Sequence, residues 1–282
     1  MKYGIYGINV GPCSDPETAV RVAQAAEEAG YESLWTGEHV VLPDPQAPPS
    51  PAPPELPFLD PAVALAYLAG HTQRVKLATG IIILPQRNPA VLAKELASVD
   101  VLSSGRLIFG IGVGYLKPEF EALGIPFERR GPRTDEYLDA ILALWTQARP
   151  AYRGEFVDFE GIQAMPRPVQ QPHPPIVVGG MSPGAYRRSV ERAHGWYGFA
   201  LDPAATAKCI EGLETASREC DRPGALGKLE ITVTPPGPLD RDLARRYEDL
   251  GVERLVALAI GGSGDAMVER VRKTAGEVGL AG

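Results

Sequence analysis

Cysteine and long apolar runs are both scarce in this chain of 282 residues. Its three cysteines, Cys13, Cys209 and Cys220, form no C-x-x-C motif and have no histidine at ligand spacing, which argues against a zinc site or a disulfide framework. No apolar run approaches the length of a membrane span, and glycines interrupt the first ten residues as in a strand. We therefore expect a cytoplasmic protein without a metal centre.

Basic residues are not in excess either. The chain has 28 Lys and Arg against 35 Asp and Glu, a formal net charge of −7. A protein that binds phosphate backbones presents a basic surface, and the clustered basic residues here are few. The composition thus predicts neither nucleic acid nor a membrane as partner, and favours a small-molecule ligand.

A strand, a helix and a second strand occupy residues 76–114. Residues 76–84 are a continuous apolar run, typical of a strand buried on both faces, and the run ends at Pro85. Asn88 before Pro89 predicts a helix start, and Gly105 predicts its end. Residues 106–112 form a second buried strand, so the unit is a right-handed βαβ with parallel strands.

The second strand of this unit carries three glycines, Gly110, Gly112 and Gly114. Glycines at these positions would allow a ligand to approach closely and would leave backbone N–H groups free to bind an anion. Crowded packing or a tight turn would explain the same glycines equally well. The same two interpretations apply to Gly80. The G-x-G-x-G spacing, followed closely by Pro118, excludes a dinucleotide fingerprint, which needs G-x-G-x-x-G and an immediate helix.

Strand and helix patterns alternate along the whole chain. Strands are expected at residues 2–8, 33–36, 76–84, 106–112, 176–178, 196–200, 229–234 and 255–259. Each is followed by a helix, at residues 16–29, 62–70, 89–104, 133–145, 183–193, 203–219, 241–250 and 265–278. Eight such units in this length predict an α/β protein with a TIM (β/α)8 barrel as a single domain over residues 1–282. A doubly wound sheet would have fewer strands.

Three insertions are expected at the C-terminal face of the barrel, at about residues 43–60, 114–132 and 148–175. The first is unusual, because nine of the nineteen residues 43–61 are proline, which excludes a helix or an inner strand. A long loop after a barrel strand commonly covers the ligand, so we predict a mobile cover over residues 43–58; a plain surface excursion is the alternative. Residues 148–175 are expected to contain a hairpin.

Five segments carry a resemblance to a known family: WTGEH at 35–39, ATGIIILPQRNP at 78–89, GRLIFGIGVG at 105–114, RRGPRTDE at 129–136 and VVGG at 177–180. Together and in this order they resemble the luciferase-like monooxygenase superfamily, and more narrowly its probable coenzyme F-420-dependent oxidoreductase branch. The resemblance spans nearly the whole chain. It implies a TIM barrel, usually a homodimer, that holds a flavin or deazaflavin against the strand ends.

The resemblance also implies roles for single residues. Glu38 and His39 match the acid and the histidine of the deazaflavin dehydrogenases, with Glu38 touching the ring system and His39 at its reacting face. We assign both to catalysis, and expect a non-proline cis peptide within residues 79–81. The remaining cofactor-binding residues, including three of the glycines considered above, are Thr79, Gly80, Ile81, Gly112, Gly114, Gly179, Gly180, Met181 and Gly198.

The chain departs from the superfamily's sugar-phosphate dehydrogenase at two positions. Pro43 stands where that enzyme has a Trp, and Tyr115 stands where it has a Glu. A sugar phosphate is therefore not the predicted substrate. Arg129, Arg130 and Arg133 are interpreted as a solvated ion-pair cluster, with contact to a phosphate or polyglutamate tail of the cofactor as the alternative.

The sequence and the resemblance together predict hydride transfer between coenzyme F-420 and a small organic substrate. His39 would carry the accompanying proton, since an imidazole titrates near neutral pH; the other three histidines are interpreted as structural. An FMNH2-dependent monooxygenase of the same family, with FMN as cofactor, is the alternative. A flavin-binding barrel without turnover, or a glycosidase with Glu38 and Glu119 as paired carboxylates, comes third.

Overall fold

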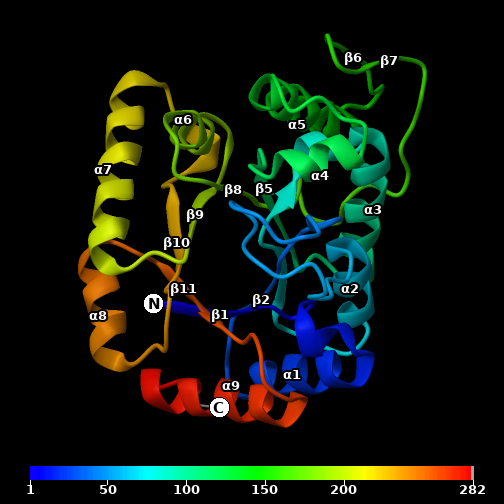
Figure 1. The fold of residues 1–282 in the computed structure, drawn as a ribbon. Helices are drawn as coiled ribbons and strands as arrows, with labels where there is room; N and C mark the ends of the chain where they lie inside the picture. The colour runs from blue at the N-terminus through cyan, green and yellow to red at the C-terminus, as the bar shows by residue number, and fades with distance from the viewer. Residues whose placement is uncertain (281–282) are drawn as a thin grey trace.

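The computed structural model describes residues 1–280, which form a closed barrel of parallel strands surrounded by helices (Figure 1). Each barrel strand pairs in parallel with the next, and the first pairs with the last. In order around the barrel they are β1 (Lys2–Tyr6), β2 (Ser33–Thr36), β3 (Lys76–Thr79) with β4 (Ile82–Ile83), β5 (Leu107–Gly112), β8 (Ile176–Gly179), β9 (Gly195–Phe199), β10 (Glu230–Thr234) and β11 (Arg254–Leu258). The predicted TIM barrel is confirmed.

A helix follows every barrel strand, and α9 lies beside α1 to close the outer ring (Figure 1). The helices are α1 (Pro16–Glu28), α2 (Pro61–Ala69), α3 (Pro89–Leu102), α5 (Arg130–Thr146), α6 (Pro183–Arg192), α7 (Pro203–Glu219), α8 (Arg241–Asp249) and α9 (Gly264–Val278), with a short α4 (Lys117–Ala122) between β5 and α5. Asn88 caps α3 as expected, because its side chain accepts the N–H groups of Ala90 and Val91. No helix within residues 1–280 is long and apolar enough to cross a bilayer.

Two elements differ locally from the expected ones, and the expected hairpin is found. The predicted strand at residues 76–84 is divided into β3 and β4, and the Gly80–Ile81 peptide between them is cis, as expected for residues 79–81. The helix predicted at residues 133–145 begins at Arg130, because Pro132 lies in the first turn, where a missing N–H breaks no helical hydrogen bond. The expected hairpin is present as β6 (Tyr152–Arg153) and β7 (Asp158–Phe159).

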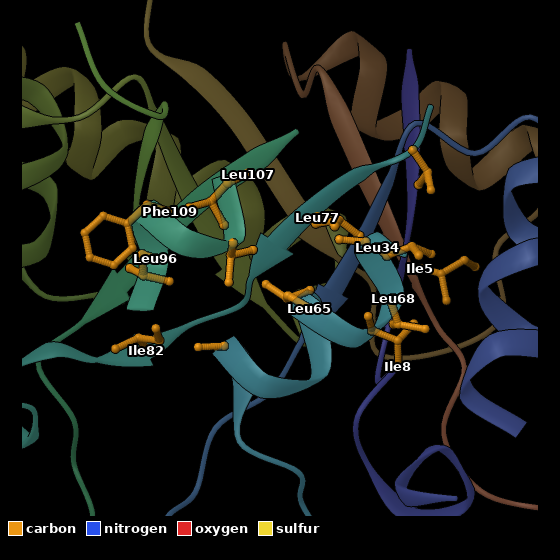
Figure 2. Close-up of a cluster of buried hydrophobic side chains, with 14 of the residues drawn as sticks. Ile5, Ile8, Leu34, Leu65, Leu68, Leu77, Ile82, Leu96, Leu107 and Phe109 are labelled. Atoms are coloured by element: carbon orange, nitrogen blue, oxygen red, sulfur yellow. The ribbon is translucent and has the colours of Figure 1, made fainter. Parts of the chain in front are cut away.

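Two apolar layers hold the barrel together. The outer layer lies between strands and helices, and Figure 2 shows part of it, with Ile5, Leu34, Leu77 and Phe109 on strands facing Leu65, Leu68 and Leu96 on helices. The inner layer fills the barrel and comprises Tyr6, Trp35, Ala78, Ile108, Val177, Tyr197 and Val256. Since successive strand residues alternate between these layers, the strands read as continuous apolar runs.

Charged side chains close the end of the barrel where the strands begin. The guanidinium of Arg254, with a side chain only 4% exposed, binds the carboxylates of Glu32 and Glu230. Lys2 also pairs with Glu230. These contacts join the starts of β1, β10 and β11 to the residue before β2, so four strands are tied at this end.

Candidate active site

His39 lies just beyond the carboxyl end of β2, with a side chain only 9% exposed. Its ring stands edge-on to Phe58, at 5.6 Å between centroids, and to Tyr115, at 6.2 Å. Its Nδ1 atom is 3.4 Å from Oε2 of Glu119, whose side chain is fully buried. Two distant segments of the chain, one with Phe58 and one with residues 115–119, thus enclose one imidazole at the end of a barrel strand.

Glu119 reaches His39 from helix α4. Its other oxygen, Oε1, accepts the backbone N–H of Val40 at 2.6 Å. Within residues 1–280, His39 is the one basic side chain within 4 Å of this carboxylate. The pairing was not predicted, because residues 114–132 were expected to be an insertion without a helix. Pro118, a residue that suits the first turn of a helix, was the available signal.

Glu38 binds other groups than this pair. Its carboxylate accepts the N–H of Ile83 and binds the guanidinium of Arg87, which also lies 2.7 Å from Asp60. Burial raises the pKa of Glu38, while Arg87 and the Ile83 N–H lower it. Both oxygens are occupied by protein groups, so the geometry is that of a positioning residue, and a catalytic role for Glu38 stays a prediction. The same geometry leaves no free carboxylate pair for a glycosidase.

The glycines of β5 and β8 make room for Ile81 and the backbone beside it. A Cβ on Gly112 would lie 1.9 Å from Ile81 Cδ1, and one on Gly179 would lie 2.9 Å from the same atom. A Cβ on Gly110 would lie 1.9 Å from the carbonyl oxygen of Thr79. Crowded packing therefore explains why glycine occupies these positions. It does not test the predicted cofactor contacts of Thr79, Ile81, Gly112 and Gly179, which stay predictions.

The other predicted cofactor-binding residues also lie where barrel strands end. Gly80 is packed against the carbonyl of Thr36, and Gly198 against Trp196 and Leu201. Gly114 and Gly180 have positive φ angles of 74° and 122°, a conformation that favours glycine. Met181 is 59% exposed and precedes Ser182, the N-cap of α6.

Large apolar side chains are exposed around the same strand ends. They are Val40 and Val41 after β2, Tyr115 after β5, Met181 after β8 and Phe199 at the end of β9, each at least 40% exposed. Exposed apolar groups gathered in one region mark binding surfaces. In the same region, the buried Nδ1 of His39 and Oε2 of Glu119 have no hydrogen-bonding partner within the described chain.

The arginine cluster is only partly an ion-pair cluster. Arg129 pairs with Glu155, as expected. Arg130 and Arg133 have no carboxylate within 4 Å in the described chain: Arg130 donates to the Gly114 carbonyl at 3.0 Å and stacks on Phe127, and Arg133 donates to Pro126. The ion-pair prediction is wrong for these two, because the early start of α5 turns them toward loop carbonyls and aromatic rings.

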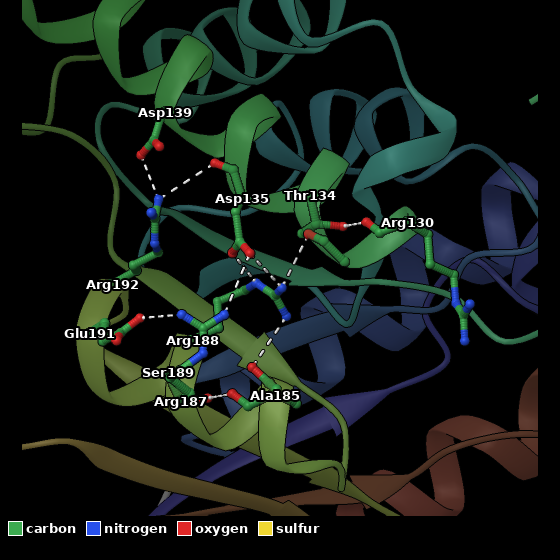
Figure 3. Close-up of polar contacts among 12 residues, drawn as sticks. Arg130, Thr134, Asp135, Asp139, Ala185, Arg187, Arg188, Ser189, Glu191 and Arg192 are labelled. Atoms are coloured by element: carbon green, nitrogen blue, oxygen red, sulfur yellow. Dashed lines mark hydrogen bonds and ion pairs between the residues drawn. The ribbon is translucent and has the colours of Figure 1, made fainter. Parts of the chain in front are cut away.

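Ion pairs at this corner instead join α5 to α6 (Figure 3). Arg188 binds Asp135 through two hydrogen bonds of 2.7 and 3.1 Å, and Arg192 binds Asp139 at 2.5 Å. Because Arg188 is buried, this contact fixes the helix that follows Gly180 and Met181.

The proline-rich segment begins at the end of β2 and returns to the same face. Leu59 donates its N–H to Asn9, and Asn9 in turn binds Gly37 through its side chain at 2.9 Å. Its placement at the C-terminal face is as predicted, and its mobility stays a prediction.

The fold and this site define the class: a TIM-barrel protein with a buried histidine and an apolar binding surface at the carboxyl ends of the strands, where enzymes of this fold carry out their chemistry. The chain belongs to the luciferase-like monooxygenase family, whose sequence profile matches residues 7–250. Members of this family are oxidoreductases and monooxygenases that depend on F420 or a flavin.

Individual relatives fall into both cofactor groups. The oxygenase component of a flavin-dependent trigonelline monooxygenase from Acinetobacter baylyi is 34% identical over 200 residues, 68% of this chain and 52% of its own. Two solved structures share the fold. They are the monooxygenase RslO1 from Streptomyces bottropensis (TM-score 0.80, 23% identity, 99% and 98% of the two chains) and the coenzyme F420-dependent tetrahydromethanopterin reductase from Methanopyrus kandleri (TM-score 0.77, 17% identity, 98% of each).

Proposed function

We propose that the protein is an oxidoreductase that transfers hydride between coenzyme F-420 and a small organic substrate bound where the barrel strands end. One observation carries the proposal: His39 is buried against Glu119 at the end of β2, next to exposed apolar side chains. A bound deazaflavin would supply two-electron hydride chemistry at that place.

The chain's own contribution is to hold and move a proton. Hydride exchange with a carbonyl or a carbon–carbon double bond requires a proton as well, and an imidazole exchanges protons near neutral pH. The other histidines lie elsewhere in the fold. His71 binds the carbonyl of Tyr67 after α2, and burial lowers the pKa of both His173 and His194, which lie beside the starts of β8 and β9. His39 is thus the histidine suited to the reaction.

The residues that would hold the cofactor come from the strand ends already described. Ile81 and the exposed side chains of Tyr115 and Phe199 offer apolar surfaces for the ring. The turn at Gly180 and Met181, at the N-terminus of α6, offers backbone N–H groups for the phosphate-bearing tail. Arg130, beside Gly114, brings a positive charge to the same face.

A second candidate function is FMNH2-dependent monooxygenation. It is favoured by the identity to the trigonelline monooxygenase, which is higher than that to the F420-dependent reductase. This chemistry requires a site shielded from water, and residues 43–58 are placed at the face that would need covering.

Equilibrium titration distinguishes the two. The purified protein is titrated separately with F-420 and with FMN, oxidised and reduced, with cofactor fluorescence as the signal. We expect saturable binding of F-420 that is tighter than that of FMN. Tighter binding of reduced FMN, with oxygen consumed on addition of substrate, would favour the monooxygenase, and binding of neither would refute both.

We also propose that the protein is a homodimer that associates through α2 and α3. Helix α2 has no charged residue, yet its Val63 and Tyr67 are 66% and 43% exposed. On α3, Val91 and Leu102 are 55% and 63% exposed. A helix that is apolar on all sides, as α2 is, is normally buried, and an uncharged helix avoids repulsion between two chains of net charge −7.

A further inference from the structure

We propose that Glu119 is a positioning residue that holds neutral His39 in the tautomer with its proton on Nδ1, leaving Nε2 as the atom that exchanges a proton with the substrate. The inference rests on the proposed function for its catalytic meaning. The tautomer itself follows from the arrangement of donors and acceptors in the protein alone.

The contact joins two atoms that have no other polar partner. Nδ1 of His39 and Oε2 of Glu119 are both buried, make no other hydrogen bond, and lie 3.4 Å apart. The alignment does not complete a hydrogen bond in this state, and catalytic hydrogen bonds often tighten only when the substrate binds. A buried polar atom without a hydrogen bond lowers the stability of the fold. A hydrogen bond between these two atoms would remove that cost for both of them.

The direction of that hydrogen bond follows from the chemistry of a carboxylate, which when ionised accepts at both oxygens and donates at neither. Oε1 of Glu119 accepts the backbone N–H of Val40 at 2.6 Å, which leaves Oε2 to accept from His39. The proton of neutral His39 must therefore lie on Nδ1, and Nε2 then carries the free lone pair.

The other titratable groups around His39 do not offer Nδ1 an alternative partner. The Tyr115 ring stands edge-on to the imidazole, and burial together with Glu119 raises the pKa of its hydroxyl. Both oxygens of Glu38 are engaged, one by Arg87 and the other by the Ile83 N–H. Tyr6, near Gly37, has a pKa raised by burial and stays neutral.

This tautomer gives a balanced proton path. In the oxidation of an alcohol, Nε2 of His39 would take the O–H proton as the carbonyl forms, and a bound deazaflavin would supply the acceptor for the hydride released when the C–H bond breaks. The reverse reaction returns the proton from Nε2. The Glu119 carboxylate stabilises the imidazolium in between, without itself receiving the proton.

The substitution Glu119→Gln tests the tautomer without removing the Val40 contact. The amide oxygen of Gln accepts the Val40 N–H, so its NH2 group must face His39. Nδ1 then has to accept, and the imidazole proton moves to Nε2. The matched control is Glu121→Gln on the same helix, whose carboxylate is 63% exposed and pairs only with Lys117.

The readout is the imidazole 15N chemical shifts of the cofactor-free, full-length protein, recorded at a pH where histidines are neutral. The chain has four histidines, and a spectrum of His39→Asn assigns the one in question. We expect the Nδ1–H tautomer in the wild type and in Glu121→Gln, and the Nε2–H tautomer in Glu119→Gln. If Glu119→Gln does not fold, the wild-type spectrum decides, because an Nε2–H tautomer there overturns the proposal.

Turnover separates this proposal from the function on which it rests. With the F-420 substrate pair, Glu119→Gln should lower kcat by roughly 100-fold or more and leave KM nearly unchanged, as expected when a general acid–base residue is misoriented. A reversed tautomer with unchanged kcat would overturn the positioning role. If the 15N spectra show the predicted tautomers but the protein does not bind F-420, the proposed function is wrong and the assignment of the tautomer stands.

Discussion

Replacing Gly112 by alanine would test whether this glycine serves packing or ligand approach. The new Cβ would lie 1.9 Å from Ile81 Cδ1, a separation that real atoms do not tolerate, so Ile81 or β5 must move. Overpacking of a core typically costs about 1–3 kcal/mol. We expect a loss of about 2 kcal/mol, or a drop of roughly 4–8 °C in Tm for a chain of this size.

A second substitution removes the clashing atom. Ile81→Val deletes Cδ1 and leaves Cγ1, which is 3.3 Å from the same Cβ position, a tight but tolerable contact. Alone, Ile81→Val should cost about 1 kcal/mol. Together, the two substitutions should cost less than the sum of their separate effects, with a favourable coupling of about 1–2 kcal/mol.

Thermal unfolding of the four cofactor-free proteins, followed by circular dichroism, measures this coupling. The control is Gly276→Ala in α9, where a Cβ meets nothing within 4 Å and alanine should be neutral or slightly stabilising. An unchanged Tm in Gly112→Ala, with weakened cofactor binding, would show that the packing argument is wrong and that Gly112 admits the ligand.

Three further predictions concern other parts of the chain. His39→Asn should lower kcat by roughly 100- to 10,000-fold with little change in cofactor Kd, and full turnover in this variant would remove His39 as the proton carrier. Burial of Glu27 opposes its ionisation, but the N–H groups of residues 73–75 outweigh this and lower its pKa. The ionised Glu27 side chain therefore contributes about 1 kcal/mol of stability, after allowance for exposure, that is present at neutral pH and is lost as the pH falls through its lowered pKa. The stability difference between wild type and Glu27→Gln should shrink steadily as the solution is acidified, and a difference independent of pH would contradict this. Val63→Glu with Leu102→Glu should convert a dimer to a monomer in light scattering, whereas Val169→Glu, at an exposed position outside α2 and α3, should not.

The fold could be predicted because the helix caps and apolar runs of single segments agreed with the alternation of strands and helices along the whole chain. Asn88 before Pro89, and the apolar runs of the strands, each specify one structure irrespective of distant contacts. The misplaced start of α5 shows the limit, since Pro132 is compatible with either a loop or a first helical turn.

The site was harder to predict because it depends on contacts between distant segments. His39 was identified from its neighbours in sequence, but its carboxylate partner is not the adjacent Glu38; it is Glu119, eighty residues away on a helix that no periodic pattern marked. Arg87 was likewise missed, although it determines where Glu38 points. Residues adjacent in the chain point in different directions at a strand end, so sequence proximity alone does not identify the partner.

The ion pairs around Arg254 suggest how this barrel could acquire a new substrate. They tie β1, β2, β10 and β11 at the end opposite the candidate active site. Substitutions at sites far apart change the free energy of unfolding nearly additively. Changes in the loops at the active-site end therefore leave the stabilising effect of the ion pairs at the opposite end in place. Mutant libraries confined to the exposed residues within 40–58 and 113–129, with Glu119 and the buried Leu116 and Phe120 left unchanged, should therefore tolerate many changes, and selection on them can act on specificity rather than on folding.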